Sequence, residues 1–336
     1  MQLDAQEAQA LIDALRRMQL LQNGEVPVLT PLAGGVSSLI VRADTLRGPL
    51  CVKRALARLK VAAVWEAPVR RNRAEVAWMR VAMGIVPDAV PAILGEDAQD
   101  NAFAMAWLEP GQYPVWKSLL QRGVADPATA RTVGSKLVAI HGATAGDAAL
   151  ARAFANDADF YALRLEPYFV EAARQQPACA GVLQRLVDTT AANRRALVHG
   201  DISPKNILVG PHGPVILDAE CAWYGDPAFD LAFCLNHLLL KCVARPASTP
   251  DYLRCFDALA GAYLPQVSWE PAAALEARTC LLLAGMLLAR IDGKSPVEYI
   301  YLETDRERVR RFAITLLLQP LASLTAIRQR WTSIHP

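Results

Sequence analysis

Residues 197–209 read Leu-Val-His-Gly-Asp-Ile-Ser-Pro-Lys-Asn-Ile-Leu-Val, a polar loop between two short apolar segments. A second apolar run at 214–217 ends directly before an Asp-Ala-Glu triplet. Short apolar runs beside turn residues predict strands, so Asp201 and Asn206 would lie in a loop between two strands and Asp218 would follow the next strand. Their oxygens are of the kind that hold Mg²⁺, and a carboxylate can also accept a proton from a hydroxyl group. The alternative is a hairpin whose Asp and Asn side chains only satisfy backbone groups of the turn.

The wider pattern resembles a family. The loop from His199 reads His-Gly-Asp-x-x-x-x-Asn, Asp218 opens an Asp-x-Glu triplet, and Gly225 begins Gly-Asp-Pro-x-x-Asp-Leu-Ala. This order resembles the aminoglycoside phosphotransferase and choline kinase-like group of small-molecule kinases. The resemblance implies ATP and Mg²⁺ as cofactors and a protein-kinase-like α+β fold.

The resemblance also implies roles for individual residues. Asp201 would be the catalytic residue that orients the acceptor hydroxyl and accepts its proton. The metal ligands would be Asn206 and Asp218, with Glu220 assisting the metal or its waters. His199 and Asp230 would support the catalytic loop without taking part in the chemistry.

A glycine-containing loop near the N-terminus connects two strand-like runs, at 26–32 and 39–42. Glycine lets backbone N–H groups approach phosphate oxygens closely, so the loop is a candidate phosphate cradle. Its nucleotide-binding residues would be Gly34, Gly35, Ser37 and Ser38. The full Gly-x-Gly-x-x-Gly of protein kinases is absent, and an ordinary hairpin is the alternative.

Residues 50–53 form an apolar strand that ends on Lys53, which resembles the kinase lysine that contacts the nucleotide phosphates. Downstream, Glu75 lies within a helical pattern of apolar residues. We expect an ion pair that holds Lys53 toward the nucleotide, with Glu66 as the competing partner. The alternative is that these charges are solvated at the surface.

Residues 102–111 read as a strand that runs into a turn. By the resemblance this is the hinge between two lobes, where Met105, Ala106 and Leu108 would contact the adenine ring. The prediction is therefore a small nucleotide-binding lobe of antiparallel strands at 1–106. A helical lobe at 107–336 would carry the catalytic loop and the acceptor site.

The sequence mixes the signatures of two branches. The Asp218-x-Glu220 triplet and the basic segment at 54–65 resemble the methylthioribose kinases, whereas Asn206 matches the aminoglycoside kinases. The helix expected to begin near residue 229 follows the Asp-Ala-Glu triplet so closely that the chain has no room for an activation segment like that of protein kinases.

The acceptor pocket of the family is built from late helices. Here an apolar helix breaks at Gly-Lys-Ser-Pro, beside Arg290, Asp292 and Lys294. These three residues are candidate substrate ligands, and a salt-bridged helix corner is the alternative. The late helices show no acidic excess, so we expect a sugar or amino alcohol as acceptor rather than a polycationic aminoglycoside antibiotic. A non-catalytic nucleotide-binding protein of the same fold is a further alternative.

Bulk composition limits the class of protein. The 336 residues are 53% hydrophobic with a net charge of +2, which fits a globular chain and does not favour nucleic-acid binding. The seven cysteines form no Cys-x-x-Cys pair, and no basic segment leads into an apolar stretch at the N-terminus. We expect a cytoplasmic protein without a membrane span, whose partner is a small-molecule hydroxyl acceptor.

Overall fold

The computed structural model describes residues 3–32, 38–56 and 71–334, which form two compact units. Unit 1 comprises Met1–Gln112 together with Asp218–Glu220. Unit 2 comprises Tyr113–Leu217 and Cys221–Pro336. The Asp-Ala-Glu triplet therefore belongs to unit 1, although the chain on both of its sides belongs to unit 2.

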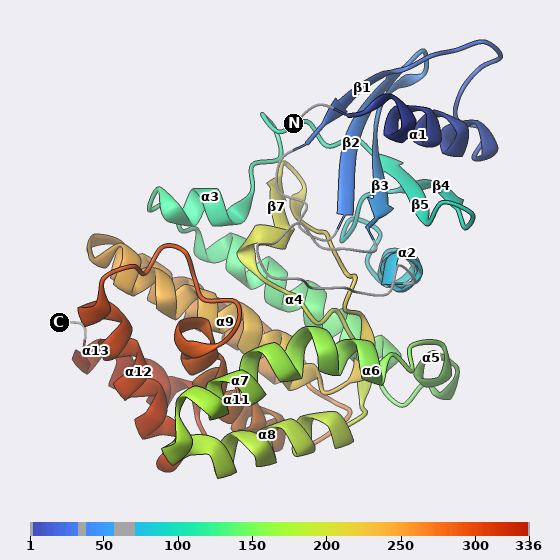
Figure 1. Ribbon diagram of the computed structural model, residues 1–336. Helices are drawn as coiled ribbons and strands as arrows, with labels where there is room; N and C mark the ends of the chain where they lie inside the picture. The colour runs from blue at the N-terminus through green and yellow to red at the C-terminus, as the bar shows by residue number, and fades with distance from the viewer. Residues whose placement is uncertain (1–2, 33–37, 57–70, 335–336) are drawn as a thin grey trace. The chain divides into compact units, whose positions relative to one another are not determined.

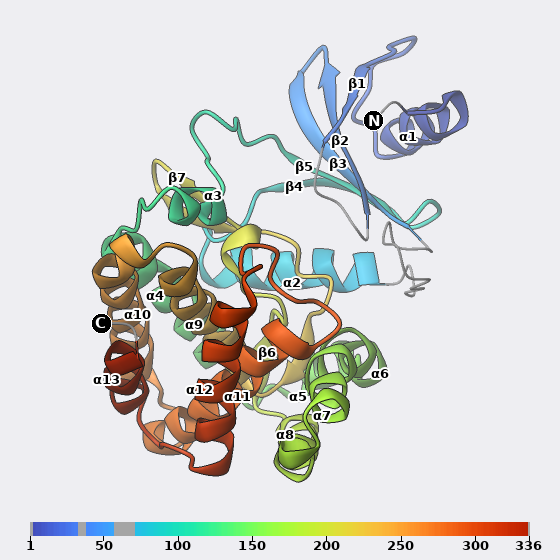
Figure 2. The same cartoon turned by 60° about the vertical axis from the view of Figure 1, so that its left-hand side comes forward.

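Unit 1 is built on a five-stranded antiparallel sheet with the order β1-β2-β3-β5-β4 (Figure 1). Its elements are α1 (Ala5–Arg17), β1 (Val28–Pro31), β2 (Ser38–Thr45), β3 (Gly48–Ala55), α2 (Arg71–Ile85), β4 (Ile93–Asp97) and β5 (Ala102–Ala106). Leu50 and Val52 of β3 pack with Leu11 and Leu15 of α1 in one apolar core, and Figure 2 shows this helix beside the sheet. Because side chains alternate along a strand, Lys53 points to the opposite face.

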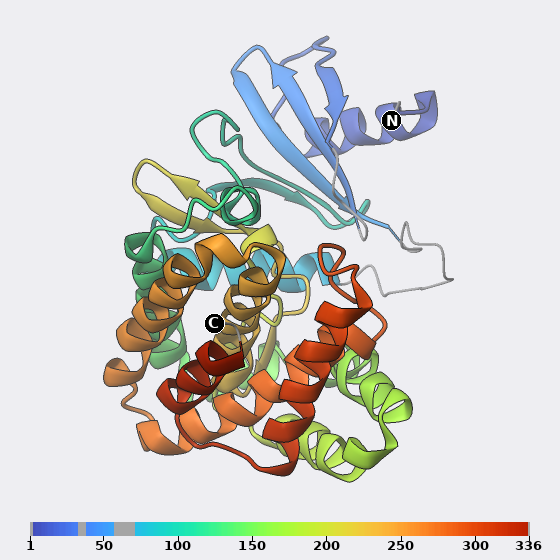
Figure 3. The same ribbon diagram turned by 90° about the vertical axis from the view of Figure 1, so that its left-hand side faces the viewer.

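Unit 2 is largely helical (Figure 3). Its helices are α3 (Trp116–Gln121), α4 (Pro127–Thr144), α5 (Ala148–Ala153), α6 (Asp157–Phe160), the π-helix η1 (Tyr161–Val170), α7 (Glu171–Gln175), α8 (Ala180–Ala192), α9 (Pro227–Ala244), α10 (Thr249–Tyr263), α11 (Ala272–Asp292), α12 (Glu303–Leu318) and α13 (Leu324–Ile334). Short 3₁₀ turns are η2 (Pro177–Cys179), η3 (Pro204–Asn206), η4 (Pro246–Ser248) and η5 (Leu264–Gln266). The predicted class is confirmed: an antiparallel sheet in the first part of the chain and helices in the second.

Two antiparallel strand pairs frame the polar loop in unit 2. Strand β6 (Ala196–Val198) pairs with β9 (Trp223–Gly225), and β7 (Ile207–Gly210) pairs with β8 (Gly213–Ile216). The loop predicted to carry the chemistry thus begins at the end of β6 and ends at the start of β7.

Helices α9 and α11 are long and apolar enough to cross a membrane by length and composition alone. However, 94% of the apolar window of α9 and 61% of that of α11 are buried inside the protein. These helices form the core of unit 2, which accounts for their apolar sequence.

Helices α4 and α10 pack closely because Gly134 has no side chain. A Cβ atom at Gly134 would lie 2.5 Å from the Leu259 carbonyl oxygen of α10. We expect Gly134→Ala to lower the free energy of unfolding by about 1–3 kcal/mol, as overpacked cores do. Urea denaturation measures the change.

Gly261 on α10 provides the matched control, since a Cβ there would meet nothing within 4 Å. Gly261→Ala should leave stability unchanged or raise it by about 0.5–1 kcal/mol. Equal effects of the two substitutions would contradict the proposed role of Gly134 in helix packing.

Candidate active site

Unit 1 holds a buried cluster of charges around Lys53. Strand β3 and helix α2 bring Lys53 Nζ to 2.6 and 2.9 Å from the two carboxylate oxygens of Glu75, and both residues are at most 3% exposed. The predicted ion pair is therefore present. Lys53 also pairs with Asp218, which has a left-handed backbone with φ of 67°. The competing partner, Glu66, lies outside the described residues.

Burial and neighbouring charge act in opposite directions on this cluster. Burial disfavours the charge on Lys53, but the carboxylates of Asp218 and Glu75 outweigh it and raise the pKa of the ammonium group. Burial raises the pKa of Glu75, although Lys53 opposes the shift. Lys53 therefore remains a cation, placed to attract anionic oxygens.

Glu220 is engaged in a second ion pair of unit 1. The Nε atom of Arg71 lies 3.0 Å from Glu220 Oε2, and the same arginine donates to the Leu56 carbonyl oxygen at 2.7 Å. Direct coordination of a metal by Glu220 would compete with this pair.

The other predicted nucleotide residues are only partly described. Gly34, Gly35 and Ser37 lie outside the described residues, whereas Ser38 begins β2 and is buried. At the end of β5, Met105 is buried and the Ala106 N–H donates to the Ala92 carbonyl oxygen at 2.9 Å. This N–H is therefore engaged within unit 1. Leu108 follows the strand.

Unit 2 holds the polar loop, in which Asp201 is 2% exposed. The side-chain amide of Asn206 donates to Asp201 Oδ2 at 2.9 Å and to the Asp201 carbonyl oxygen at 3.0 Å. Arg164 Nη2 and Lys205 Nζ lie 3.0 and 3.1 Å from the same carboxylate oxygen. One carboxylate oxygen is thus held by an amide and two cations.

Asp230 fixes the backbone of this loop from the first turn of α9. Its carboxylate is fully buried and accepts the N–H groups of His199 at 2.7 Å and Gly200 at 2.8 Å. Gly200 has φ of 77°, and a Cβ there would lie 2.5 Å from the Cys221 carbonyl oxygen, so the position requires glycine. His141, from α4, adds a third contact to Asp230 at 3.2 Å.

His199 connects the two ends of the loop. Its Nδ1 accepts the Asp201 N–H at 3.1 Å, and its Nε2 donates to the Leu217 carbonyl oxygen at 3.0 Å. This tautomer satisfies both ring nitrogens. His199 and Asp230 therefore lie where the sequence predicts loop support.

The residues of the loop suit a magnesium ion. Because Asn206 donates to Asp201 through Nδ2, its Oδ1 atom remains as a possible ligand. The Leu217 N–H donates to the Asn206 carbonyl oxygen at 2.8 Å, and Asp218 is the next residue in the chain. Within the described ranges no three His, Cys, Asp or Glu side chains gather as a metal centre. An amide oxygen and ligand phosphates are donors that Mg²⁺ commonly uses, and the other predicted ligand, Asp218, belongs to unit 1.

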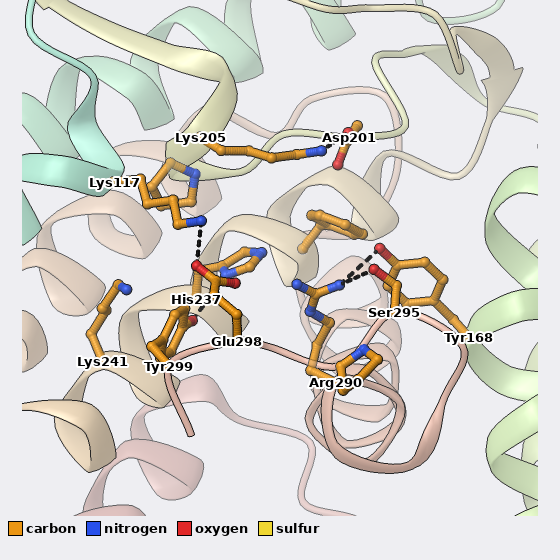
Figure 4. A pocket seen from close by; sticks show the side chains of 13 residues that line it. Lys117, Tyr168, Asp201, Lys205, His237, Lys241, Arg290, Ser295, Glu298 and Tyr299 are labelled. Atoms are coloured by element: carbon orange, nitrogen blue, oxygen red, sulfur yellow. Dashed lines mark hydrogen bonds and ion pairs between the residues drawn. The ribbon is translucent and has the colours of Figure 1, made fainter. Parts of the chain in front are cut away.

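A cavity of about 200 Å³ adjoins Asp201 in unit 2 (Figure 4). Arg290 lines it, as predicted, but Asp292 and Lys294 do not. Asp292 accepts two hydrogen bonds from Arg310 of α12, and Lys294 is paired with Glu166 at the surface. Asp292 and Lys294 therefore form salt bridges at the end of a helix, which was the alternative to a substrate-binding role.

Arg164 is a site residue that the sequence analysis missed. It lies in the π-helix η1, where Pro167 interrupts the regular helical pattern, and its Nε donates to the Gly200 carbonyl oxygen at 2.6 Å. π-Helical turns are frequent at functional sites. A proline inside a helical segment was the available signal.

We expect Asp230→Ala to lower the free energy of unfolding by about 3 kcal/mol or more. The reason is that two buried N–H groups lose their acceptor, at about 1–3 kcal/mol each. Asp147 is a matched control because it also accepts two backbone N–H groups, at 2.7 and 2.9 Å, but is exposed at the start of α5.

Asp147→Ala should cost about 1 kcal/mol, as for a surface helix cap. Urea denaturation of both variants gives the comparison. Similar losses would mean that burial of the Asp230 carboxylate does not matter.

The chain is similar to several known proteins. Residues 28–241 match the model of the phosphotransferase enzyme family. A methylthioribose kinase of Erwinia tasmaniensis is 31% identical over 90 residues, which are 27% of this chain and only 22% of that kinase.

Two solved structures are similar in fold. A Plasmodium vivax ethanolamine kinase aligns with a TM-score of 0.59 at 10% identity, covering 96% of this chain and 93% of that one. The amicoumacin kinase hAmiN, in complex with AMP-PNP, Ca²⁺ and Ami, aligns with a TM-score of 0.56 at 14% identity, covering 97% of this chain and 100% of that one. The predicted kinase-like fold is thereby confirmed. With the family match over residues 28–241, the chain belongs to the phosphotransferase enzyme family.

Proposed function

We propose that the protein transfers the γ-phosphoryl group of ATP to a hydroxyl group of a small polar metabolite. The observation that carries the proposal is the Asp201 carboxylate, held by Asn206 at 2.9 Å in a braced loop beside a small cavity. A buried carboxylate at the wall of a cavity can receive a hydroxyl proton from a bound acceptor.

The proposed reaction is a direct displacement. The acceptor oxygen forms a bond to the γ-phosphorus atom of ATP while the bond from that phosphorus to the β–γ bridging oxygen breaks. ADP leaves with the bonding electrons, and the hydroxyl proton passes to Asp201. Since the transition state of phosphoryl transfer is loose, positioning and charge neutralisation supply most of the catalysis.

The remaining residues would serve the nucleotide and the metal. Lys53, held by Glu75, would bind the phosphates, and Asn206 with Asp218 would hold Mg²⁺. Bound there, Mg²⁺ would neutralise the charge that develops on the phosphates. Glu220 would act on the metal through water, because Arg71 engages its carboxylate. The AMP-PNP and Ca²⁺ in the complex of amicoumacin kinase support a nucleotide and a divalent cation as partners.

The proposed contacts to adenine, and the contacts to phosphate other than that of Lys53, rest on the resemblance to the small-molecule kinases. We propose the glycine loop (Gly34, Gly35, Ser37) with Ser38 for the phosphates, and the Met105–Leu108 segment, including Ala106, for adenine. A cytoplasmic location is likewise proposed, supported by seven cysteines that are all free and buried.

The predicted acceptor classes remain to be distinguished. Sugars, amino alcohols and aminoglycosides all carry suitable hydroxyl groups, and a non-catalytic nucleotide-binding role is the remaining alternative. The presence of Lys53, Asp201, Asn206 and Asp218 together supports catalysis, because each has a distinct role in the reaction.

The function is tested by measuring ATP consumption with Mg²⁺ across methylthioribose, other sugars, sugar acids, choline, homoserine and aminoglycosides. Acceptor-dependent release of ADP, with phosphate recovered on the acceptor, supports the proposal. ATP binding without consumption on any member would favour a nucleotide-binding protein.

We expect Asp201→Asn to lower kcat by about 10²–10⁴-fold, the usual contribution of a positioned general base. Binding of a non-hydrolysable ATP analogue should change by less than about twofold, because Asp201 contacts the acceptor side of the reaction in this proposal. Steady-state kinetics and calorimetry give the two values. A variant that retains turnover would exclude Asp201 as the base.

A further inference from the structure

The cavity beside Asp201 is lined by more cations than carboxylates. Its charged residues are Lys117, Lys205, Lys241, Arg290, Asp201 and Glu298. Two of the cations are neutralised locally, since Lys205 pairs with Asp201 at 3.1 Å and Lys117 with Glu298 at 2.5 Å. Lys241 and Arg290 remain, and they determine the charge of the cavity.

Lys241 carries a buried amino group whose charged form lacks a partner. It lies on α9, is 1% exposed, and its Nζ finds no hydrogen-bond acceptor among the residues that the structure describes. The Tyr299 ring, with its centroid 3.3 Å from Nζ, supplies only a cation–π contact. A buried ammonium group without a charged or hydrogen-bonded partner is costly, so an acceptor in the cavity would stabilise it.

Arg290 faces the same cavity from α11. Its guanidinium Nη1 donates to the hydroxyl groups of Ser295 at 3.0 Å and Tyr168 at 3.3 Å. Its Nε lacks a hydrogen-bond partner, and the contacts of this guanidinium group within the described ranges are to hydroxyl groups and not to a carboxylate. Two neutral hydroxyl groups orient the guanidinium group but leave its charge uncompensated.

We propose that the phosphoryl acceptor is an alcohol that carries an acidic group, either a carboxylate or a phosphate ester. Lys241 and Arg290 bind the acidic group while the hydroxyl group lies at Asp201. In Figure 4, Asp201 and Lys205 lie along one side of the cavity, and Lys241 and Arg290 along the other. This inference rests on the proposed function and narrows its acceptor.

The same charges disfavour the other acceptor classes. The ammonium group of an amino alcohol or an aminoglycoside would meet two uncompensated cations, and like charges in a partly buried site repel. A neutral sugar would displace water from Lys241 and Arg290 without supplying a counter-charge. An acidic group avoids the repulsion and supplies the missing counter-charge. The planar guanidinium group of Arg290 can form two parallel hydrogen bonds to carboxylate or phosphate oxygens.

Calorimetry on the full-length protein, loaded with a non-hydrolysable ATP analogue and Mg²⁺, tests the proposal. The probes are pairs that differ mainly in the acidic group: gluconate against sorbitol, glycerate against glycerol, and glucose 6-phosphate against glucose, with choline as a cation. At least one acidic probe should bind about tenfold or more tightly than its uncharged partner. The first two pairs report a carboxylate and the third a phosphate.

Lys241→Met and Arg290→Gln should each weaken that binding by about 10–100-fold, the range for a lost charged hydrogen bond. Arg311→Met, on the exposed face of α12, removes one positive charge elsewhere and should leave it unchanged. The affinity for the ATP analogue shows that each variant is folded. If no acidic probe binds selectively, or if both cavity variants bind it like the unaltered protein, the proposal is wrong.

ATP consumption separates this inference from the proposed function. Turnover with uncharged or cationic acceptors, but not with acidic ones, would overturn the acidic acceptor and leave the kinase function standing. Selective binding of an acidic probe that depends on Lys241 and Arg290, without any ATP consumption, would support the acid site and count against the kinase function.

The proposal also predicts a pH dependence. Burial, with a contribution from Lys117, lowers the pKa of Lys241 to about 7, while Glu298 raises it. Burial lowers the pKa of His237 well below its usual value, with Arg290 and Lys241 adding to the shift, so its imidazole stays neutral. The charged and titratable groups around Lys241 are Lys117, Lys205, His237, Arg290, Glu298 and Tyr299.

Only the protonated form of Lys241 attracts an anion. Gluconate affinity should therefore be constant below pH 7 and fall above it, by up to about tenfold per pH unit, with proton uptake on binding. Lys241→Met should lack this decline. Calorimetry between pH 6 and 9 measures both, and an unaltered protein whose affinity does not change with pH would contradict the role of Lys241.

Discussion

The buried carboxylate of Asp230 is the constraint on which the candidate site in unit 2 depends. The loop after β6 has no strand partner at His199 and Gly200, and their N–H groups donate to Asp230 at 2.7 and 2.8 Å instead. Asp230 belongs to the first turn of α9, whose N-terminus favours negative charge. A buried helix of the core therefore holds the backbone of the candidate loop two residues before Asp201.

The sequence was informative wherever the chemistry depends on short spacing. A single loop carrying Asp201 and Asn206 and an ion pair between Lys53 and Glu75 were both expected, and both are present. The first needs only one turn between two strands, and the second needs a strand followed by a helix. Local patterns of this kind determine geometry because few backbone conformations satisfy them.

The sequence was uninformative where pairing joins distant elements. Asp292 was expected at the acceptor site, but Arg310 from the next helix engages its carboxylate at 2.8 and 2.9 Å. Lys241 stands in a run of apolar residues on α9, and its spacing does not reveal whether its ammonium group reaches solvent or a cavity. Long side chains can do either, so only the packing of α9 and α11 decides.

Net charge describes the chain as a whole, whereas an acceptor meets a few side chains. At a net charge of +2, the composition gave no reason to expect an acidic acceptor.

The charged residues of the cavity nevertheless form two groups. At Asp201, an amide and two cations restrain the carboxylate, as positional catalysis requires. At Lys241 and Arg290, positive charge is left over. In the proposed enzyme, the polar loop would place Asp201 through its fixed backbone, while α9 and α11 would supply the charge that selects the acceptor.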